Sequence, residues 1–532
     1  MKRNLLGISL ITISCLYGML AAVIILITLL TGTPVIYGVG ISIIVLIIQF
    51  LISPFVTDLS MRWFYRARFD YDIPDYLKKF IEEVCQRHNM KYPKIGFIDD
   101  GAPNAFTYGH TKNDARIIIT RGILELLNEE EVKAVVGHEL GHASHYDMLF
   151  MTVAQLVPLI LYGIYEMFID SNTKDRDGKD SGYGLIIAIV AYILYIISNY
   201  IVLWLSRTRE YYADSFSIEE TKNPHALANA LVKVGYGLST AETNAKHSAA
   251  KSNALGIFDS KTSKALVVSS TEENGHLSRE NIKQAMKWEQ WNVWAKWYEL
   301  NSTHPLISKR LLAISARSKE YNQEPYIVFD LKKEESYVDD FLKEVIIDFL
   351  PKISLLICAG ITIYCLATKE PFSLYFGLYI IVTVAFSFVK FKRRYPTYSF
   401  DNFTVKDLLG EVKVSHITAI PCSLEGTIIG RGNPGCIFNE DFVIKDTTGI
   451  IFLDYNQPVR IVNKIFALFK SPDYFDKKIK IKGWYRRSPV PYVEIKSMEI
   501  DGKEKKIYTY AANIAILLIG LAIGIYFIIA GL

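Results

Sequence analysis

Residues 136–164 read VGHELGHASHYDMLFMTVAQLVPLILYGI, a polar motif followed directly by a long apolar run. The motif is His-Glu-x-x-His, from His138 to His142. Positions i and i+4 share one face of a helix, so both imidazoles can reach one metal ion. The apolar run that follows can cross a membrane, which takes roughly 20 residues. The stretch therefore predicts a metal-binding helix that runs into a membrane span.

The composition of the chain agrees with a membrane protein. It has 532 residues, 50% of them hydrophobic and 21% charged, with a net charge of only +4. A chain with this much apolar sequence is not disordered. Its net charge is too small to favour a nucleic-acid partner. The length leaves room for three or so domains at roughly 150 residues each. The six cysteines form no C-x-x-C pair, so the sequence does not predict a thiolate zinc site.

Seven apolar stretches are long enough to span a bilayer. They are residues 5–30, 35–57, 149–169, 184–206, 349–368, 371–390 and 510–531. The first apolar run is too long for a secretory signal, and the second follows almost at once, which favours a retained hairpin. Basic residues such as Arg62, Arg207 and Arg393 all fall on one side of these spans. By the positive-inside rule we expect a multi-pass plasma-membrane protein whose polar blocks face the cytoplasm.

The expected fold is mainly α and polytopic, with about seven transmembrane helices, a cytoplasmic α+β catalytic domain and a small C-terminal β domain. The predicted segments are a transmembrane hairpin (1–57), a block around the His-Glu-x-x-His motif (58–348), a second hairpin (349–390), a cytoplasmic β-rich domain (391–508) and a last span (509–532). Asn128 and Glu131 form a capping-box pattern where the motif helix begins. Alternating β-branched residues and clustered glycines in 391–508 indicate a small OB-like barrel.

A two-histidine zinc site needs a third protein ligand and an open position for water. After the next predicted span the chain returns with Arg-Thr-Arg-Glu-Tyr-Tyr-Ala-Asp at 207–214. Glu210 is the candidate third ligand, and Asp214, one turn later, could orient an imidazole from behind. Two plainer interpretations stay open. The histidines could be structural, and 207–214 could be a basic membrane-edge helix with an internal ion pair.

The sequence H-E-L-G-H before one span and R-E-Y-x-A-D after the next resembles the HtpX and CAAX-prenyl-protease family of integral-membrane zinc metallopeptidases. Pro-Asn-Ala-Phe at 103–106 and Thr-His-Pro at 303–305 with Arg310 match the same family, and the resemblance covers about 35–315. The additional span pair at 349–390, the β domain and the last span depart from the usual pattern.

The resemblance implies a zincin-type catalytic domain with one Zn²⁺ per chain. It implies that the metal ligands are His138, His142 and Glu210. Glu139 would be the catalytic base, and His304 would steady the oxyanion. Asn104, Asp214 and Arg310 would lie near the cleft or behind the ligands. Zinc lowers the pKa of water toward about 7, so Glu139 could take its proton at neutral pH.

We therefore expect a zinc endopeptidase that cleaves membrane or membrane-proximal proteins, with misfolded membrane proteins as the substrates that the HtpX resemblance implies. A prenyl-peptide specificity is the narrower alternative. The competing interpretation is a membrane scaffold that binds partners through its β domain and holds a structural or vestigial zinc site. The expected partners are the membrane and peptide or protein substrates, without nucleic acid.

Three further segments allow two interpretations each. The strand predicted at 115–120 could pair with an extended substrate or lie inside a sheet. The tryptophans at 288, 291, 294 and 297 could place a helix in the headgroup layer or pack against the peptidase domain. Trp484 and Tyr485 are adjacent and would face opposite ways on a strand, so they form no single stacking platform and favour a docking or regulatory module.

Overall fold

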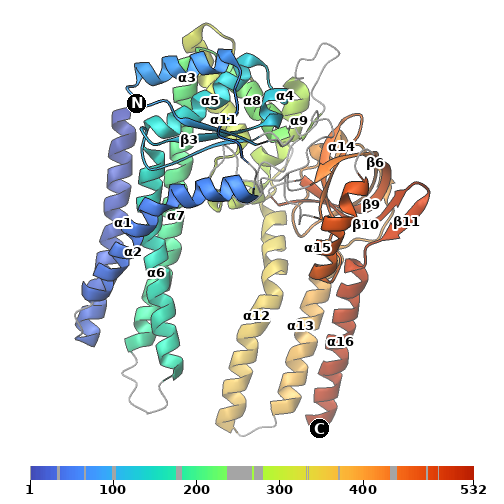
Figure 1. Cartoon of the computed structure of the whole chain (residues 1–532). Helices are drawn as coiled ribbons and strands as arrows, with labels where there is room; N and C mark the ends of the chain where they lie inside the picture. Colours follow the sequence, from blue (N-terminus) through green and yellow to red (C-terminus); the bar gives the residue numbers. More distant parts are fainter. Residues whose placement is uncertain are drawn as a thin grey trace. The chain divides into compact units, whose positions relative to one another are not determined.

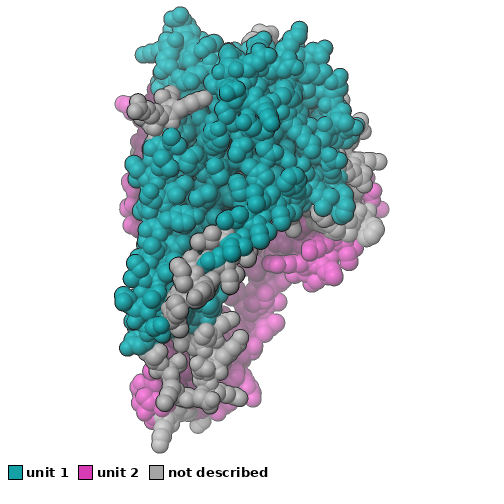
Figure 2. All heavy atoms as spheres, turned by 60° about the vertical axis from the view of Figure 1, so that its left-hand side comes forward, with its two compact units in different colours: residues 1–231, 251–259, 299–328 teal, residues 232–250, 260–298, 329–532 magenta. Residues whose placement is uncertain are grey.

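The structure, a computed structural model, is mainly helical (Figure 1). It describes residues 2–32, 36–64, 67–98, 104–174, 183–236, 267–268, 279–330, 332–333, 335–368, 372–431, 440–474, 477–488 and 491–531. The chain forms two compact units, coloured separately in Figure 2. The first comprises residues 1–231, 251–259 and 299–328, and the second 232–250, 260–298 and 329–532.

Six helices among the described residues are long and apolar enough to cross a membrane. They are α1 (Lys2–Thr31), α6 (Asp147–Lys174), α7 (Tyr183–Thr221), α12 (Val338–Thr368), α13 (Phe372–Arg394) and α16 (Thr509–Gly531). The predicted stretch 35–57 lies in α2 (Ile36–Phe64), a helix of 29 residues that is not among those six. The count of seven spans and the cytoplasmic orientation therefore stay predictions.

The first unit contains a three-stranded sheet in the order β1-β3-β2. Its strands are β1 (Lys94–Ile98), β2 (Ala105–Tyr108) and β3 (Arg116–Thr120). β3 is parallel to β1 and antiparallel to β2, and all its residues are buried. Of the two interpretations of this strand, the structure supports the internal one, because β3 is already paired on both sides. The edge strands of the sheet are β1 and β2.

Helices surround this sheet within the first unit. They are α3 (Asp75–Arg87), α4 (Arg121–Leu126), α5 (Glu129–Ser144), the first residues of α8 (Pro224–Tyr236), α11 (Ile307–Ser318) and the short 3₁₀ helix η1 (Lys319–Tyr321). α5 begins with the predicted capping box. The Asn128 side chain accepts from the Glu131 N–H at 3.0 Å, and the Glu131 carboxylate accepts from the Asn128 N–H at 3.0 Å.

The motif helix does not continue into the span, contrary to the prediction. α5 ends at Ser144 and α6 begins at Asp147. Between them Tyr146 has φ of +58°, in the left-handed region that L-residues seldom adopt. The chain therefore turns sharply here. The turn brings Asp147, the first residue of α6, next to the last turn of α5.

Two glycines allow α5 to pack closely against α7. A methyl group at Gly141 would lie 3.1 Å from the Phe216 Cβ and 3.2 Å from the Ala213 Cα. At Gly137, one turn earlier, it would lie 3.3 Å from the Ser217 hydroxyl. These separations are shorter than the optimum for carbon atoms, about 3.5–4.0 Å. Small residues at i and i+4 therefore let the two helices that carry the motif residues approach each other.

The second unit contains a closed five-stranded barrel. Its strands are β6 (Ile420–Arg431), β7 (Phe442–Lys445), β8 (Gly449–Asp454), β9 (Lys478–Arg487) and β10 (Pro491–Ile500). The order β10-β9-β6-β7-β8 closes because β10 also pairs in parallel with β8. α15 (Arg460–Phe469) lies between the third and fourth strands. Trp484 and Tyr485 are both buried in this unit.

Shorter elements complete the second unit. They are β4 (Val267–Val268), α9 (Arg279–Trp291), α10 (Val293–Leu300, as far as residue 298), β5 (Asp401–Asn402), α14 (Val405–Gly410), the 3₁₀ helix η2 (Ser471–Tyr474) and β11 (Lys503–Lys506). The second unit thus includes two segments that we expected in the peptidase block, residues 260–298 and 329–348.

The tryptophan-rich segment belongs to the second unit. Asn292 interrupts the helix between α9 and α10, and its side chain donates to the Val412 carbonyl at 2.8 Å. The Trp288 indole is fully buried and donates to the Val414 carbonyl at 2.8 Å. Trp288, Trp291 and Trp294 are buried within the second unit, whereas Trp297 is 43% exposed. The placement in the headgroup layer stays a prediction.

Candidate metal centre

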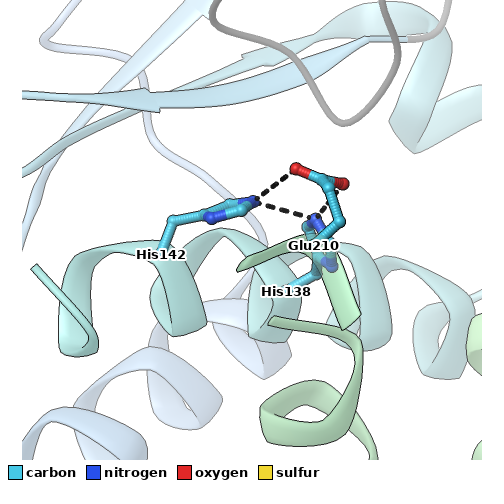
Figure 3. A group of neighbouring side chains, drawn as sticks. All are labelled: His138, His142 and Glu210. Atoms are coloured by element: carbon cyan, nitrogen blue, oxygen red, sulfur yellow. Dashed lines mark hydrogen bonds and ion pairs between the residues drawn. The ribbon is translucent and has the colours of Figure 1, made fainter. Parts of the chain in front are cut away.

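Two imidazoles from α5 and one carboxylate from α7 meet inside the first unit (Figure 3). The Nε2 atoms of His138 and His142 are 3.1 Å apart. The Glu210 carboxylate oxygens lie 3.4 Å from the His142 Nε2 and 3.6 Å from the His138 Nε2. Tetrahedral zinc with bonds of about 2.0–2.1 Å separates its ligand atoms by about 3.4 Å. The three side chains therefore fit one ion.

A second carboxylate holds each imidazole from behind. Asp214 Oδ1 lies 2.9 Å from the His138 Nδ1, and Asp147 Oδ2 lies 2.6 Å from the His142 Nδ1. A carboxylate at Nδ1 keeps the hydrogen on that nitrogen and leaves Nε2 as the metal-binding atom. Asp214 is the residue that the sequence analysis proposed for this position behind an imidazole. Asp147 was missed, because its position depends on the turn at Tyr146.

Two buried arginines pair with these carboxylates. Arg310 donates to Asp214 at 2.6 and 2.9 Å, and its Nη1 lies 3.4 Å from a Glu210 oxygen. Arg209 donates to Asp147 at 2.5 Å and to the His145 carbonyl at 2.7 Å. Buried charges are tolerated when they are paired in this way. The guanidinium groups thus fix the carboxylates that orient the histidines.

The buried charges of the centre match a divalent cation when the imidazoles are neutral. The buried carboxylates are Glu139, Asp147, Glu210 and Asp214, and the guanidinium groups facing them are Arg209 and Arg310. When the imidazoles are neutral, the four carboxylates and two guanidinium groups sum to a net charge of −2. In the absence of a metal ion, bound protons neutralise part of this negative charge. Burial lowers the pKa of His142, but the hydrogen bond to Asp147 and the nearby Glu210 outweigh burial and raise it to about 9.

Glu139 lies beside the three candidate ligands with one free oxygen. The Thr107 hydroxyl donates to its Oε2 at 2.7 Å, whereas Oε1 is buried without a hydrogen-bond partner among the described residues. Burial raises the pKa of this carboxyl, while the two imidazoles and the Thr107 hydrogen bond act in the opposite direction. A buried carboxylate with a raised pKa and a free oxygen can accept a proton in catalysis.

Glu139 faces a cavity of about 190 Å³. Its lining residues come from α2, β2, α5, α6, α7 and the segment before α11; they include Ser53, Pro54, Thr107, Tyr108, His142, Met148, Met151, Gln155, Glu210 and His304. The structure thus joins the metal centre to a space that a substrate could enter. Part of its wall is the first turns of the candidate span α6.

The other predicted site residues lie at different distances from the centre. His304 Nδ1 is 3.0 Å from a Glu210 oxygen, and its buried Nε2 has no hydrogen-bond partner in the described part of the chain. Asn104 is not among the residues lining the cavity, and its backbone N–H donates to the Thr120 hydroxyl at 2.8 Å. The His145 ring packs against Phe216 and is not one of the three candidate ligands.

Sequence reasoning also missed Thr107 and Arg209. No spacing rule connects Thr107 with Glu139, because strand β2 and helix α5 meet only in the fold. Arg209 lies in the 207–214 segment that the sequence analysis singled out, but its role was missed because its partner Asp147 is 62 residues earlier in the chain. The sequence carried no local signal for Asp147, because its approach to His142 depends on the turn at Tyr146.

Comparison with known proteins places the centre inside a matched region. The family model "Peptidase family M48" matches residues 74–318, which contain every residue of the centre. The protease HtpX homologue of Methanothermobacter thermautotrophicus is 39% identical over 229 residues, covering 42% of this chain and 83% of the relative. The protease HtpX homologue of Picrophilus torridus is 32% identical over 218 residues, which covers 40% of this chain and 69% of the relative.

Among solved structures, the crystal structure of S. mikatae Ste24p aligns with 56% of this chain and 62% of its own, at 16% identity and a TM-score of 0.33. This overall similarity is too low to define the fold. Residues 391–508, which hold the barrel strands, lie outside the matched 74–318.

Proposed function

Because the chain belongs to peptidase family M48, we propose that it is an integral-membrane zinc endopeptidase acting on membrane or membrane-tethered polypeptides. One observation carries the proposal. The ligand atoms of His138, His142 and Glu210 converge within 4.8 Å of one another, and Glu139 holds beside them a carboxylate oxygen that no described residue hydrogen-bonds. The six candidate spans support the membrane setting.

His138, His142 and Glu210 would hold the zinc ion, which supplies Lewis acidity for the carbonyl and lowers the pKa of water toward about 7. The chain's own groups perform the proton transfers. Glu139 Oε1 takes a proton from the attacking water while Thr107 holds Oε2. The water oxygen bonds to the peptide carbon. The C–N bond then breaks as Glu139 passes the proton to the leaving amine.

His304 is the proposed donor to the oxyanion that develops on the substrate carbonyl. Its Nε2 is buried in the cavity wall without a described partner, so it can direct a hydrogen at a substrate atom. This role requires the hydrogen on Nε2. A single donor of this kind contributes about 3 kcal/mol to the transition state.

The cavity walls favour an extended substrate close to the membrane surface. β2 is one of the two edge strands of its sheet, and Thr107 and Tyr108 from this strand line the cavity. An extended peptide could pair with such an edge through main-chain hydrogen bonds. Met148 and Met151 on α6 add apolar side chains to the cavity lining. Methionine side chains adapt to varied apolar partners, so we expect broad rather than sequence-specific cleavage.

The test is cleavage of casein, or self-cleavage, by detergent-purified full-length protein with and without zinc. Glu139→Gln should abolish cleavage. Glu130→Gln on the exposed surface of the same helix is the matched control and should keep full activity. Zinc-independent cleavage, or activity in Glu139→Gln, would contradict the proposal. If all proteins were inactive yet bound stoichiometric zinc, the scaffold interpretation would be favoured.

A further inference from the structure

We propose that helix α15 of the barrel unit lies in the headgroup layer of the bilayer and binds anionic lipid. The proposal is independent of the peptidase activity, since it concerns only the second unit. It rests on an exposed apolar face, on hydrogen bonds that tie this helix to the start of a membrane span, and on the charges that surround it.

The outward face of α15 is apolar. Ile461, Val462 and Ile465 are 65%, 46% and 53% exposed. At 100° per residue these three fall within one arc of about 100° on the helix surface. Single exposed apolar residues are common on proteins. Three large ones on one face of a ten-residue helix are typical of a helix that lies in a membrane interface.

The opposite face fixes α15 to the barrel. Ala467 is fully buried, and the Phe466 ring stacks on Tyr455 with centroids 4.2 Å apart. The Asn463 side chain is also buried, accepts from the Gln457 N–H at 2.9 Å and donates to the Asn456 side chain at 3.1 Å. The helix is therefore seated by its inward face. Its apolar outward face is not needed for the core of the barrel.

Hydrogen bonds place α15 at the level where α16 begins. The Tyr508 N–H donates to the Gln457 side chain at 3.1 Å, and that side chain donates to the Lys506 carbonyl at 3.3 Å. The Thr509 hydroxyl, at the first residue of α16, donates to the Asn456 carbonyl. The chain enters α15 only three residues after Gln457. In Figure 1, α15 accordingly lies beside the barrel ends of α13 and α16.

The barrel and its spans are also firmly connected. The Tyr395 hydroxyl, directly after α13, donates to Glu494 of β10 at 2.6 Å. The Asn513 side chain in α16 donates to the same hydroxyl at 3.3 Å. Trp484 of β9 packs against Tyr395 and Tyr510. A span that crosses the bilayer therefore holds this end of the barrel, and α15 with it, at the membrane surface.

The charges around α15 complement an anionic surface. Arg460 and Lys464 are exposed and flank the apolar arc on one side. β11, which leads into α16, exposes Lys503, Lys505 and Lys506 against one acid, Glu504. Basic residues next to a span are attracted to anionic lipid headgroups. An apolar arc beside lysine and arginine is the pattern of an interfacial helix.

The test is photo-crosslinking of the full-length chain in vesicles of equal parts phosphatidylglycerol and phosphatidylcholine. p-Benzoylphenylalanine replaces Ile465, an exposed apolar position where an aromatic side chain disturbs no core. The control is the same residue in place of Lys406, exposed on α14, which Figure 1 draws at the end of the barrel away from α16. Mass spectrometry of the irradiated protein then identifies what has become attached.

We expect lipid adducts at position 465 and none at 406, with phosphatidylglycerol several-fold enriched over phosphatidylcholine. Replacing both flanking bases, Arg460→Gln with Lys464→Gln, should bring the two lipids toward equal yield. Absence of lipid adducts at 465 would overturn the proposal, as would crosslinks to a second polypeptide, which would assign the face to a protein partner. Equal lipid yields in the unsubstituted helix would overturn the anionic preference.

Discussion

The close approach of α5 and α7 predicts that Gly141→Ala weakens both the fold and the metal centre. The added methyl would lie 3.1, 3.2 and 3.3 Å from the Phe216 Cβ, the Ala213 Cα and the Ala213 carbonyl oxygen. Two of these atoms are backbone, and the third is attached to it, so none can rotate away. The helices must separate by a few tenths of an ångström.

The expected energy follows from two opposing effects. Overpacking by one methylene typically costs about 1–3 kcal/mol. Replacing glycine by alanine inside a helix stabilises the helix by about 1 kcal/mol. Gly163→Ala on α6 is the matched control, because nothing lies within 4 Å of its added methyl. The control gains only the helical contribution, so the difference between the two variants isolates the overpacking cost of about 1–3 kcal/mol.

The assay is thermal unfolding of both purified variants at one scan rate, together with zinc affinity by chelator competition. At about 2 °C per kcal/mol for a unit of this size, Gly141→Ala should melt roughly 2–6 °C below Gly163→Ala. Its zinc affinity should also fall, because Glu210 moves away from the two histidines. If Gly141→Ala matched the control in melting and in zinc affinity, our account of the α5–α7 contact would be refuted.

Three further predictions concern the groups around the ligands. Asp147→Asn should weaken zinc binding about 10–100-fold in chelator competition, since His142 loses the charge that orients it; wild-type affinity would exclude that role. Zinc affinity should rise from pH 6 to 8 by about tenfold per unit, because His142, with its pKa of about 9 when metal-free, must release a proton on binding; a pH-independent titration would contradict this. Thr107→Val removes a hydrogen bond that lowers the pKa of Glu139. It should move the acidic limb of the kcat/KM profile to higher pH at unchanged zinc content, and an unshifted limb would argue against Thr107 as the partner of the base.

The residues predicted best from sequence were those fixed by local geometry. The i, i+4 spacing alone puts His138 and His142 on one face of a helix, and the capping box at Asn128 follows from the same local rules. Glu210 came from topology, because one span out and one span back return the chain to the same side. That argument did not require knowledge of how α5 and α7 pack.

The residues missed were those whose position depends on long-range contacts or on one backbone angle. Asp147 reaches His142 only because Tyr146 adopts a left-handed conformation. Trp288 pairs with a carbonyl 126 residues away, so its spacing along the chain could not identify the unit it stabilises. The central place of β3 depends on which strands flank it, and alternation along a single strand carries no such information.

The zinc content of two purified full-length variants tests the central claim most directly. Glu139→Gln removes the proposed base and leaves the three ligands, whereas Glu210→Gln removes one ligand and leaves the base. We predict one zinc ion per chain in Glu139→Gln and little or none in Glu210→Gln. Equal zinc in both variants would contradict the assignment of Glu210 as the third ligand and, with it, the metal centre described above.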